Sequence, residues 1–370
     1  MLTLKVINSY DDFISLRSSW NHLLERSESN GIFLTWEWLR NWWDTFKLDK
    51  ELLIILGYRN DDLVAIAPFM TKNCVMFGFQ LRSIEFIGSG LESMPDHLNL
   101  ITLKEIKYEF IRRICDYLQM HKHSWDILRL NDMQEDHDLM MYLPKFLGAD
   151  KVSILSKPQD ICPYIELPGS WDDYLHNLSS EGRYSIKRKD RSLKRAYKVE
   201  FSIWNDEEHL ENMMRKLEEI HKSRMIAKGM GGASTDALFW EFHRKIARQF
   251  MEKGWLLLGV LTADDAVAAC QYSFQYGGKA YYYQSGMDQS FGKYGVGVIL
   301  MADMIKESIR RGLGEYDFLR GEEEYKSHWT NKARNSAEII VWNDCIKPKA
   351  LSWVFALKEG IRGVWNSFAA

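Results

Sequence analysis

Cysteine is scarce in this chain of 370 residues and is never clustered. No C-x-x-C pair occurs, and the five cysteines lie far apart, at Cys74, Cys115, Cys162, Cys270 and Cys345. An odd number at such wide spacing argues against a disulfide framework and against a zinc site. This usage is typical of a protein from the reducing cytoplasm, and we expect no bound metal.

Long apolar runs and an excess of one charge are missing as well. No stretch approaches the ~20 apolar residues that a membrane span needs, and the N-terminal MLTLKVINSYDDF lacks the apolar region of a signal peptide. The net charge is only −3, so the charge of the whole chain gives no reason to expect a nucleic acid or an anionic membrane as partner. The composition predicts a soluble, cytoplasmic protein.

Proline is rare, and its distribution is informative. Three of the seven prolines fall in SKPQDICPYIELPGS, residues 156–170, which marks a junction between two parts of the chain. The length is sufficient for two domains. We therefore expect an N-terminal unit over residues 1–158, a second unit over 159–346 and a C-terminal helix over 347–370.

One pattern of strands and helices occurs twice. Residues 52–69 (LLIILGYRNDDLVAIAPF) predict a strand, a turn and a strand, and residues 256–274 (LLLGVLTADDAVAACQYSF) predict the same. In both places another strand, an amphipathic helix and a short strand follow, the last at 125–130 and at 316–321. The order predicts two related α/β units in tandem, each a mixed sheet flanked by helices.

Two further segments have unusual compositions. Residues 35–46 (TWEWLRNWWDTF) predict a helix with Thr35 as N-cap, and the helical spacing of Trp36, Leu39, Trp43 and Phe46 favours a place in the core. Residues 183–198 hold eight Lys or Arg against one acid. That run is either a solvated helix face or an anion site.

The C-terminal segment KPKALSWVFALKEGIRGVWNSF predicts a last amphipathic helix. Docking on the second unit is the favoured role, and contact with a membrane surface or with a synthase complex is the alternative. Two internal glycines weaken the helix in either case.

A glycine-rich turn precedes the long helix of the second half. After the strand of residues 279–286 the chain reads MDQSFGKYGVGVILMADMIKESIRR. Gly292, Gly295 and Gly297 allow successive N–H groups to point outward at the positive end of the helix dipole, where phosphate or diphosphate binds well. The spacing is not that of a dinucleotide fingerprint, and the G-K-[ST] of a nucleotide P-loop is missing. A plain tight turn is the alternative.

Strand, glycine turn, amphipathic helix and strand in this order resemble the coenzyme A-binding segment of the GNAT (GCN5-related N-acetyltransferase) superfamily. FGKYGVG, DFLRGEEEYK and the trailing Trp329 look like the cellulose-biosynthesis-associated (CelD-like) acetyltransferases, a branch related to the Fem peptidoglycan aminoacyl transferases. The resemblance covers most of the second unit and extends diffusely to the first. It implies an α/β (α+β) fold of tandem GNAT-like acyltransferase units, the first of them a degenerate copy on the acceptor side.

The resemblance also implies acetyl-CoA or another acyl-CoA as donor. Its diphosphate would lie on the turn, and its pantetheine between the strands of residues 280–285 and 315–319. In many GNAT enzymes Gln or Arg stands where this chain has Gly292, so the grip on phosphate would depend on the backbone or on the basic run. The residues expected at the donor are Gly292, Lys293, Tyr294, Gly295, Val296, Gly297, Val298, Tyr283 and Ser285.

Acyl transfer to an amine needs a base, a donor for the oxyanion and an acid for the leaving thiolate. We expect a backbone N–H on residues 280–285 to serve the oxyanion, Glu322 or Glu323 to act as base and Tyr325 as acid. The alternative for the glutamates is capping of the next helix, which is favoured for Glu324. His328 is a weaker candidate for the base.

Candidate contacts to phosphate or acceptor are more dispersed. They are Lys326 beside the glutamates, His221 and Arg224 on a helix, and Asp96 and His97 in the first unit. A capping aspartate and a surface histidine are the simpler interpretation of the last two.

The resulting hypothesis is an acyl-CoA-dependent N-acyltransferase with a small-molecule or saccharide acceptor, such as an amino sugar of envelope or exopolysaccharide synthesis. The first alternative is a Fem-like transferase that uses aminoacyl-tRNA, although the chain lacks the long charged helical hairpin of many such enzymes. The second is a non-catalytic scaffold that retains the fold.

Overall fold

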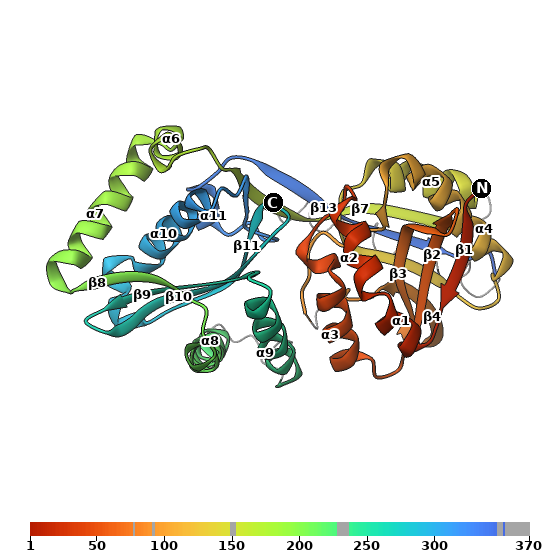
Figure 1. Ribbon diagram of the computed structural model, residues 1–370, viewed down its shortest axis with the longest axis horizontal. Coiled ribbons are helices and arrows are strands. Elements are labelled where there is room, and N and C mark those ends of the chain that lie inside the picture. The colour runs from red at the N-terminus through yellow and green to blue at the C-terminus, as the bar shows by residue number, and fades with distance from the viewer. Residues whose placement is uncertain (77, 91–92, 149–152, 228–236, 346–350, 352–370) are drawn as a thin grey trace. The chain divides into compact units, whose positions relative to one another are not determined.

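The structure is a computed structural model that describes residues 1–76, 78–90, 93–148, 153–227, 237–345 and 351 (Figure 1). It consists of two compact units, and each is described by itself. The first comprises Met1–Gly90, Met94–Gln159 and Ser336–Ala370, and the second Leu91–Ser93 and Asp160–Asn335.

The first unit is a six-stranded mixed sheet with helices. Its strand order is β1-β2-β3-β4-β6-β13, and every neighbouring pair is antiparallel except β4 and β6. The short β5 pairs with β3. The elements are β1 (Thr3–Ile7), α1 (Tyr10–Ser15), α2 (Arg17–Glu25), α3 (Trp36–Phe46), β2 (Lys50–Arg59), β3 (Asp62–Met76), β4 (Phe79–Phe86), β5 (Ile101–Thr102), α4 (Lys107–Met120), β6 (Ile127–Gln134), α5 (His137–Leu147) and β13 (Ala333–Trp342).

The aromatic helix α3 begins as predicted. Thr35 is its N-cap, and the Thr35 hydroxyl accepts a hydrogen bond from the N–H of Trp38. The four apolar residues at helical spacing are all buried in the core, namely Trp36, Leu39, Trp43 and Phe46. Burial of each such side chain stabilises the unit by roughly 1.5–3 kcal/mol, so the core assignment is confirmed.

The second unit repeats the architecture. Its strand order is β8-β9-β10-β11-β12-β7, and only β11 and β12 are parallel. The elements are β7 (Ser153–Glu166), α6 (Trp171–Asn177), α7 (Ser180–Ala196), β8 (Val199–Trp204), α8 (Glu207–Ala227), α9 (Ala237–Glu252), β9 (Leu256–Ala263), β10 (Ala266–Tyr276), β11 (Lys279–Met287), the 3₁₀ turn η4 (Gln289–Tyr294), α10 (Val296–Arg310), β12 (Glu315–Asp317) and α11 (Glu324–Ser327).

The predicted repeat is therefore confirmed. Strands β2, β3 and β4, helix α4 and strand β6 correspond in order and pairing to β9, β10, β11, α10 and β12. The fold is mixed α/β. The strand order of the first unit ends on β13, which comes from near the end of the chain, and that of the second unit ends on β7, which precedes the other strands of that unit in sequence.

The boundaries between the units fall inside these two strands. Apart from the short segment Leu91–Ser93, the chain passes from the first unit to the second between Gln159 and Asp160, one residue from the expected position. The second boundary lies between Asn335 and Ser336 rather than at residue 346, because Ser336–Trp342 pair with β6 of the first unit. Strand pairing of residues distant in sequence decided this point, and the local pattern carried no sign of it.

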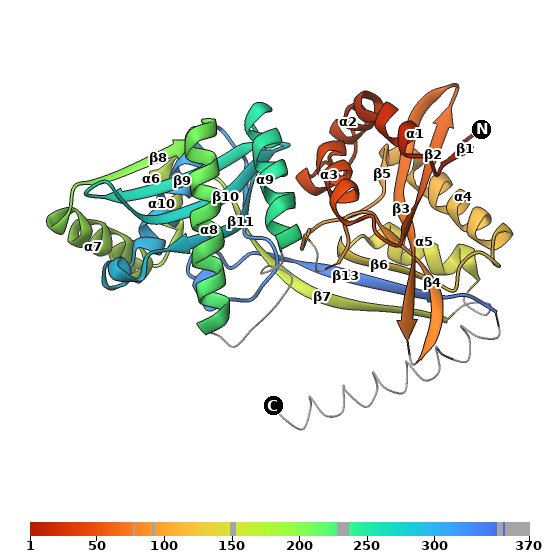
Figure 2. The ribbon, with the colours of Figure 1, turned by 90° about the horizontal axis from the view of Figure 1, so that it is seen from below.

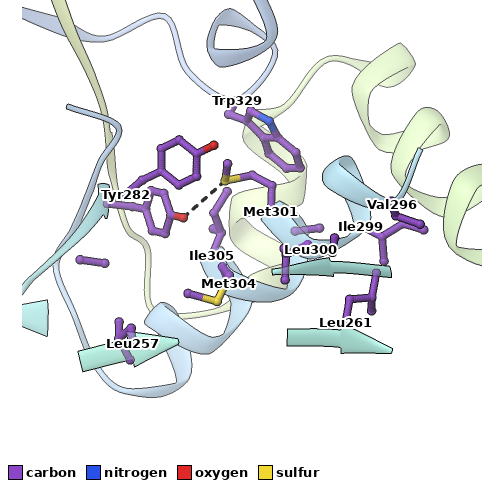
Figure 3. Close-up of a cluster of buried hydrophobic side chains, with 14 of the residues drawn as sticks. Leu257, Leu261, Tyr282, Val296, Ile299, Leu300, Met301, Met304, Ile305 and Trp329 are labelled. Atoms are coloured by element: carbon purple, nitrogen blue, oxygen red, sulfur yellow. Dashed lines mark hydrogen bonds between the residues drawn. The ribbon is translucent and has the colours of Figure 1, made fainter. Parts of the chain in front are cut away.

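In the second unit the helices cover both faces of the sheet. Helices α7 and α10 lie on one face, and α8 and α9 lie on the other (Figure 1, Figure 2). The core between α10 and the sheet includes Leu257 and Leu261 of β9 against Met304 and Ile305 of α10 (Figure 3). A Cβ at Gly259 would lie 2.1 Å from the Met304 sulfur, so this glycine allows α10 to approach β9 closely.

The expected C-terminal helix of residues 347–370 lies outside the described residues except for Leu351. Leu351 is buried in the first unit beside Leu81, Ile127 and Trp342. Among the helices in the described part of the chain, none is long and apolar enough to cross a bilayer.

Candidate active site

The second unit contains an opening between two parallel strands. β11 pairs with β12 at three positions only, Lys279–Tyr281 against Glu315–Asp317. β12 ends there, whereas β11 continues to Met287, so the two strands separate beyond Tyr281. Separation of parallel strands directs main-chain polar groups into the opening, where a ligand can bond them.

A β-bulge lies in β11 at this opening. The adjacent residues Tyr272 and Ser273 of β10 pair with Gln284 and Tyr282, so Tyr283 is the additional residue in β11. A bulge bends the strand and changes the direction of the neighbouring side chains and amides. The oxyanion donor was expected on this strand, and the bulge is the place where its amides depart from the regular ladder.

The glycine turn begins α10. Gly295 is the N-cap, with φ 69° and ψ 41° in the left-handed region, and its N–H donates to the carbonyl of Gly292 at 3.0 Å. Only Gly295 of the three glycines has a left-handed backbone; Gly292 and Gly297 do not. The first amides of a helix have no intrahelical acceptor, so the N–H groups of Val296 and Gly297 are directed outward at the positive end of the helix dipole.

The outer surface of the turn is bare at two glycines and covered at the third. A Cβ at Gly297 would meet only the Met287 sulfur, at 3.7 Å. A Cβ at Gly295 would lie 2.7 Å from Cδ of Lys189 and 2.9 Å from Cε. The ammonium group of Lys189, one bond beyond Cε, therefore lies beside the turn.

The other residues of the turn have distinct surroundings. The Lys293 ammonium lies 5.0 Å from the centre of the Tyr294 ring, which in turn makes an edge contact with Tyr197. The Val296 side chain is fully buried, so only its main chain can meet a ligand. Val298 is partly buried against the core.

The basic run forms α7, which packs against α10, and its cations have different roles. Arg183 donates to the carbonyls of Leu175, His176 and Leu178 and thereby terminates α6. Lys194 pairs with Asp190 at 2.8 Å. Within the described residues the remaining cations of α7 have no acidic partner; they are Lys187, Arg188, Lys189, Arg191 and Arg195.

Asp303 of α10 faces α7 and is largely buried. Burial, reinforced by the nearby Asp190 carboxylate, raises the pKa of Asp303 to about 6, while Lys194 and Lys306 oppose the rise. Ionisation of Asp303 therefore costs more free energy in the folded state than in the unfolded chain.

Asp303→Asn should raise the free energy of unfolding at pH 7.5 by at most about 3 kcal/mol, the equivalent of a pKa of about 6 against the ordinary 3.8. Below about pH 3 the carboxyl is neutral in both states, and the penalty develops as the pH rises toward 6. The advantage of the variant should thus shrink to about 1 kcal/mol at pH 4.5. Urea unfolding at the two pH values measures it, and an equal effect at both would contradict it.

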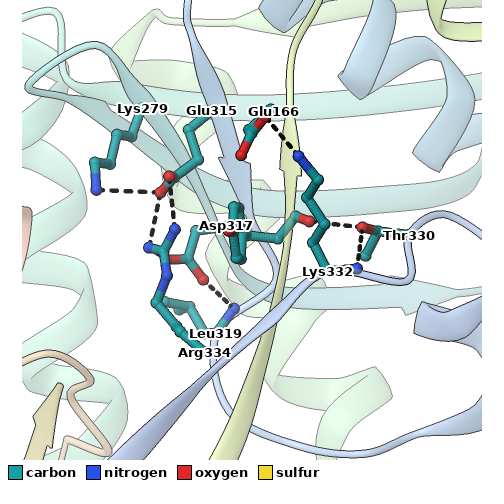
Figure 4. Close-up of polar contacts among 9 residues, drawn as sticks. Glu166, Lys279, Glu315, Asp317, Leu319, Thr330, Lys332 and Arg334 are labelled. Atoms are coloured by element: carbon teal, nitrogen blue, oxygen red, sulfur yellow. Dashed lines mark hydrogen bonds and ion pairs between the residues drawn. The ribbon is translucent and has the colours of Figure 1, made fainter. Parts of the chain in front are cut away.

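A buried ionic network fixes the chain where β12 ends (Figure 4). Asp317 is completely buried, accepts the N–H of Leu319 at 2.8 Å and pairs with Arg334 at 3.2 Å. Arg334 also pairs with Glu315 at 2.6 Å. Leu319 and Gly321 have φ of 57° and 116°, so this turn depends on its side-chain bonds to remain in place.

Lys326 completes that turn. It is 2% exposed, and its ammonium donates to the carbonyls of Arg320 at 2.6 Å, Gly321 at 3.3 Å and Leu319 at 3.4 Å. It also pairs with Glu323 at 2.9 Å. The sequence suggested a contact to phosphate or acceptor, but the ammonium is committed to the protein's own main chain because three carbonyls converge on it.

The three glutamates are exposed at the mouth of the opening. Glu323 is the N-cap residue of α11, although its side chain makes no capping hydrogen bond to the main chain and pairs with Lys326 instead. Glu324 lies in the first turn, as favoured for a helix start. Glu322 precedes them. Both Glu322 and Glu323 retain access to a ligand, and the general base stays a prediction.

Tyr325 reaches from α11 to β11. Its hydroxyl donates to the Tyr282 hydroxyl at 3.3 Å, and the Tyr282 and Ser285 hydroxyls are 2.6 Å apart. Burial raises the pKa of Tyr325, which keeps the phenol protonated through the physiological range. Three hydroxyls thus form a chain beside the opening, and two of them belong to residues predicted for the site.

Tyr283 points to the opposite face of the sheet. Its hydroxyl contacts Nε2 of His243 in α9 at 2.9 Å and donates to the carbonyl of Ser93. His243 was not among the predicted site residues. Its place among the apolar positions of the helix FWEFHRKIARQF was nevertheless a sign in the sequence of a buried polar side chain.

The ligand contacts predicted for four other residues stay predictions. His221 and Arg224 lie on α8, but their side chains are outside the described part of the structure. Asp96 and His97 belong to the first unit. Asp96 is 1% exposed, and His97 has a φ of 60°.

The corresponding helix of the first unit, α4, has a different start. Lys107 at its first turn is 2.8 Å from Asp136, 3.6 Å from Asp138 and 3.9 Å from Glu28. These carboxylates would repel a diphosphate, so the start of α4 lacks the features that predict a donor site at α10; the degenerate role of the first unit stays a prediction.

Comparison with known sequence families gives one match. Residues 180–327 correspond to a family described as acetyltransferase (GNAT) domain. This segment runs from α7 through the glycine turn to Tyr325 and the end of α11. Over these residues the second unit is similar to a GNAT-type acetyltransferase domain. No curated protein matches the chain in sequence.

Solved structures share the fold over most of the chain. FemX has a TM-score of 0.58 at 13% identity, over 88% of this chain and 95% of FemX. A protein of unknown function from Bacteroides thetaiotaomicron has a TM-score of 0.56 at 12% sequence identity, over 93% of this chain and 100% of its own. The C-terminal domain of a putative lysylphosphatidylglycerol synthetase from Agrobacterium fabrum has a TM-score of 0.54 at 8% sequence identity, over 93% of this chain and 96% of that domain. At such identities the likeness shows the fold alone.

Proposed function

We propose that the second unit transfers an acyl group, preferably acetyl, from acyl-CoA to an amine. The observation that carries this proposal is the left-handed Gly295 at the start of α10, with outward amides at Val296 and Gly297 and the Lys189 ammonium beside them. Amides at a helix N-terminus and a lysine are suited to a diphosphate. The separation of β11 and β12 beyond Tyr281 provides an adjacent path for the pantetheine.

The reaction needs no covalent enzyme intermediate. The acceptor nitrogen attacks the thioester carbonyl, the C–N bond forms, and the C–S bond then breaks. Glu322 or Glu323 takes the proton from the amine, an amide of the bulged part of β11 holds the oxyanion, and Tyr325 supplies a proton to the thiolate. The hydroxyls of Tyr282 and Ser285 connect to Tyr325 and extend this proton source along the opening.

The acceptor class rests on the resemblance to the CelD-like branch, which favours an amino sugar of envelope or exopolysaccharide synthesis. One observation favours a second candidate. The cations of α7 without acidic partners would suit the phosphates of an aminoacyl-tRNA used by a Fem-like transferase.

A thermal-shift screen with acetyl-CoA, longer acyl-CoAs and tRNA tests these proposals. A ligand at ~100 times its dissociation constant adds about 2.7 kcal/mol to the free energy of unfolding. We expect acyl-CoA to give such a shift and tRNA to give none. A salt-sensitive shift with tRNA alone would favour the Fem-like reaction, and a shift with acyl-CoA but no turnover of any amine would favour a scaffold.

Lys189→Glu should weaken acetyl-CoA binding at least about tenfold, because a charge-assisted contact worth about 1.5 kcal/mol or more becomes a repulsion. Lys187→Glu is the matched control. It makes the same change of charge on an exposed site two residues away, where the helix presents another face. Isothermal titration calorimetry measures both, and equal effects of the two variants would show that Lys189 has no specific role.

A further inference from the structure

We propose that His243 is a positioning residue for the active site, which holds the bulge of β11 through a hydrogen bond to Tyr283. The inference rests on the proposed acyl transfer and adds to it a residue on the face of the sheet opposite to the donor. His243 itself touches neither donor nor acceptor.

His243 has a fully enclosed, aromatic environment. The ring is 0% exposed and lies 4.3 Å from Phe239 and 4.9 Å from Phe242, measured between ring centres. Tyr272 and Tyr283 complete the surroundings at 5.7 Å and 4.7 Å. A buried polar side chain in such a setting is costly unless its nitrogens are hydrogen-bonded.

The directions of the hydrogen bonds follow from the chemistry of the groups. The Ser93 carbonyl can only accept, so the Tyr283 hydroxyl donates its single proton there. That hydroxyl must then accept from Nε2 of His243, 2.9 Å away. Nδ1 of the neutral ring is left as an acceptor and faces the Tyr272 hydroxyl at 3.5 Å. The Tyr272 hydroxyl is also 3.4 Å from the His243 carbonyl, and the tautomer with the proton on Nε2 is the one that fits the bonds of Tyr283.

The ring also stays neutral. Burial lowers the pKa of His243 to about 3, so at any working pH it is a fixed donor and not a titrating base.

The bond from His243 holds Tyr283, whose position in the strand is otherwise the least defined. Tyr283 is the extra residue of the bulge, and the regular ladder does not define its position. With the phenol held on the α9 side, the neighbouring Tyr282 is directed to the α10 side, where its hydroxyl meets those of Ser285 and Tyr325. The same backbone segment carries the amides proposed for the oxyanion. Loss of the bond would let both the amides and the Tyr282 hydroxyl move.

The test uses the full chain with acetyl-CoA as donor and glucosamine as acceptor probe, and it follows thiol release. His243→Phe keeps an aromatic ring without a donor, and His243→Gln keeps an N–H donor. We expect His243→Phe to lower kcat roughly 30- to 100-fold with the KM for acetyl-CoA within about threefold, as for a catalytic group displaced by about 1 Å. His243→Gln should restore most of the loss.

Tyr283→Phe should reproduce the loss and, joined to His243→Phe, add little to it, because both variants remove the same bond. A kcat of either single variant within about threefold of wild type would overturn the proposal. So would fully multiplicative losses in the double variant, or a rise of the donor KM equal to the fall of kcat, which would indicate general damage to the site.

A second measurement is independent of turnover. Nitrogen-15 NMR of histidine-labelled protein should show His243 as the neutral Nε2–H tautomer from pH 5 to 8, with a changed Nε2 resonance in Tyr283→Phe. An Nδ1–H tautomer or a ring that titrates near pH 6.5 would overturn the inference. Absence of acetyl-CoA binding by wild type would instead count against the proposed function.

Discussion

Gly297→Val should abolish the stabilisation of the protein by acetyl-CoA while the ligand-free fold remains intact. The backbone at Gly297 is not left-handed, and a Cβ there meets only the Met287 sulfur at 3.7 Å. Replacing glycine in a helix also lowers the conformational entropy of the unfolded chain, which stabilises the fold. The free energy of unfolding should therefore change by less than about 1 kcal/mol. The new side chain would, however, occupy the space in front of the outward amides.

The expected loss of donor affinity is at least about 100-fold, or 2.7 kcal/mol, since no other amide can replace those of the first helical turn. Thermal shift and calorimetry with acetyl-CoA measure it. Gly169→Val is the matched control, because its Cβ would also enter open space but far along the chain from the turn. An undiminished shift with Gly297→Val would show that the diphosphate does not lie on these amides.

Tyr325→Phe should lower kcat about 100-fold and leave the donor KM within about threefold, as for the loss of a general acid. Burial raises the pKa of this phenol, so the wild-type group is protonated at every working pH. The loss of rate should therefore be equally large from pH 6 to 9, because ionisation of Tyr325 does not contribute to the pH dependence of the wild-type rate. Thiol release with acetyl-CoA and glucosamine measures the rate.

A variant of a linked hydroxyl tests which group is the acid. Ser285→Ala removes the last member of the chain, 2.6 Å from the Tyr282 hydroxyl, and should cost less than Tyr325→Phe if Tyr325 is the acid. Should Ser285→Ala cost as much or more, the proton would reach the thiolate through Ser285. A rate for Tyr325→Phe that matches wild type would remove Tyr325 from the mechanism.

Much of the fold was predictable because it depends on local patterns. The alternation of apolar residues in the two hairpins, the amphipathic helix after each third strand and the Thr35 cap all express the geometry of one element at a time. The place of the glycine turn was predictable for the same reason. Gly295 stands immediately before a long apolar-periodic helix, where a left-handed residue is useful.

The fate of long polar side chains was not predictable from such patterns. Lys326 appeared in a cluster of charged residues and was interpreted as a ligand contact, yet three carbonyls of the preceding turn enclose its ammonium. Lys189 was one cation among eight until α7 packed on α10 and brought it across Gly295. His243 acquired a role only when the bulge of β11 placed Tyr283 beside it.

The sequence alone determined that this protein has two related α/β units, with a glycine turn at the start of a helix in the second. Periodicity and turn chemistry act between residues that are close along the chain, so they can be recognised in the sequence without a structure. Only the tertiary structure decided which cation lies at the turn, which hydroxyls meet at the opening and to which unit β13 belongs. Those outcomes depend on packing between elements distant in sequence, and no local pattern records which partners they will find.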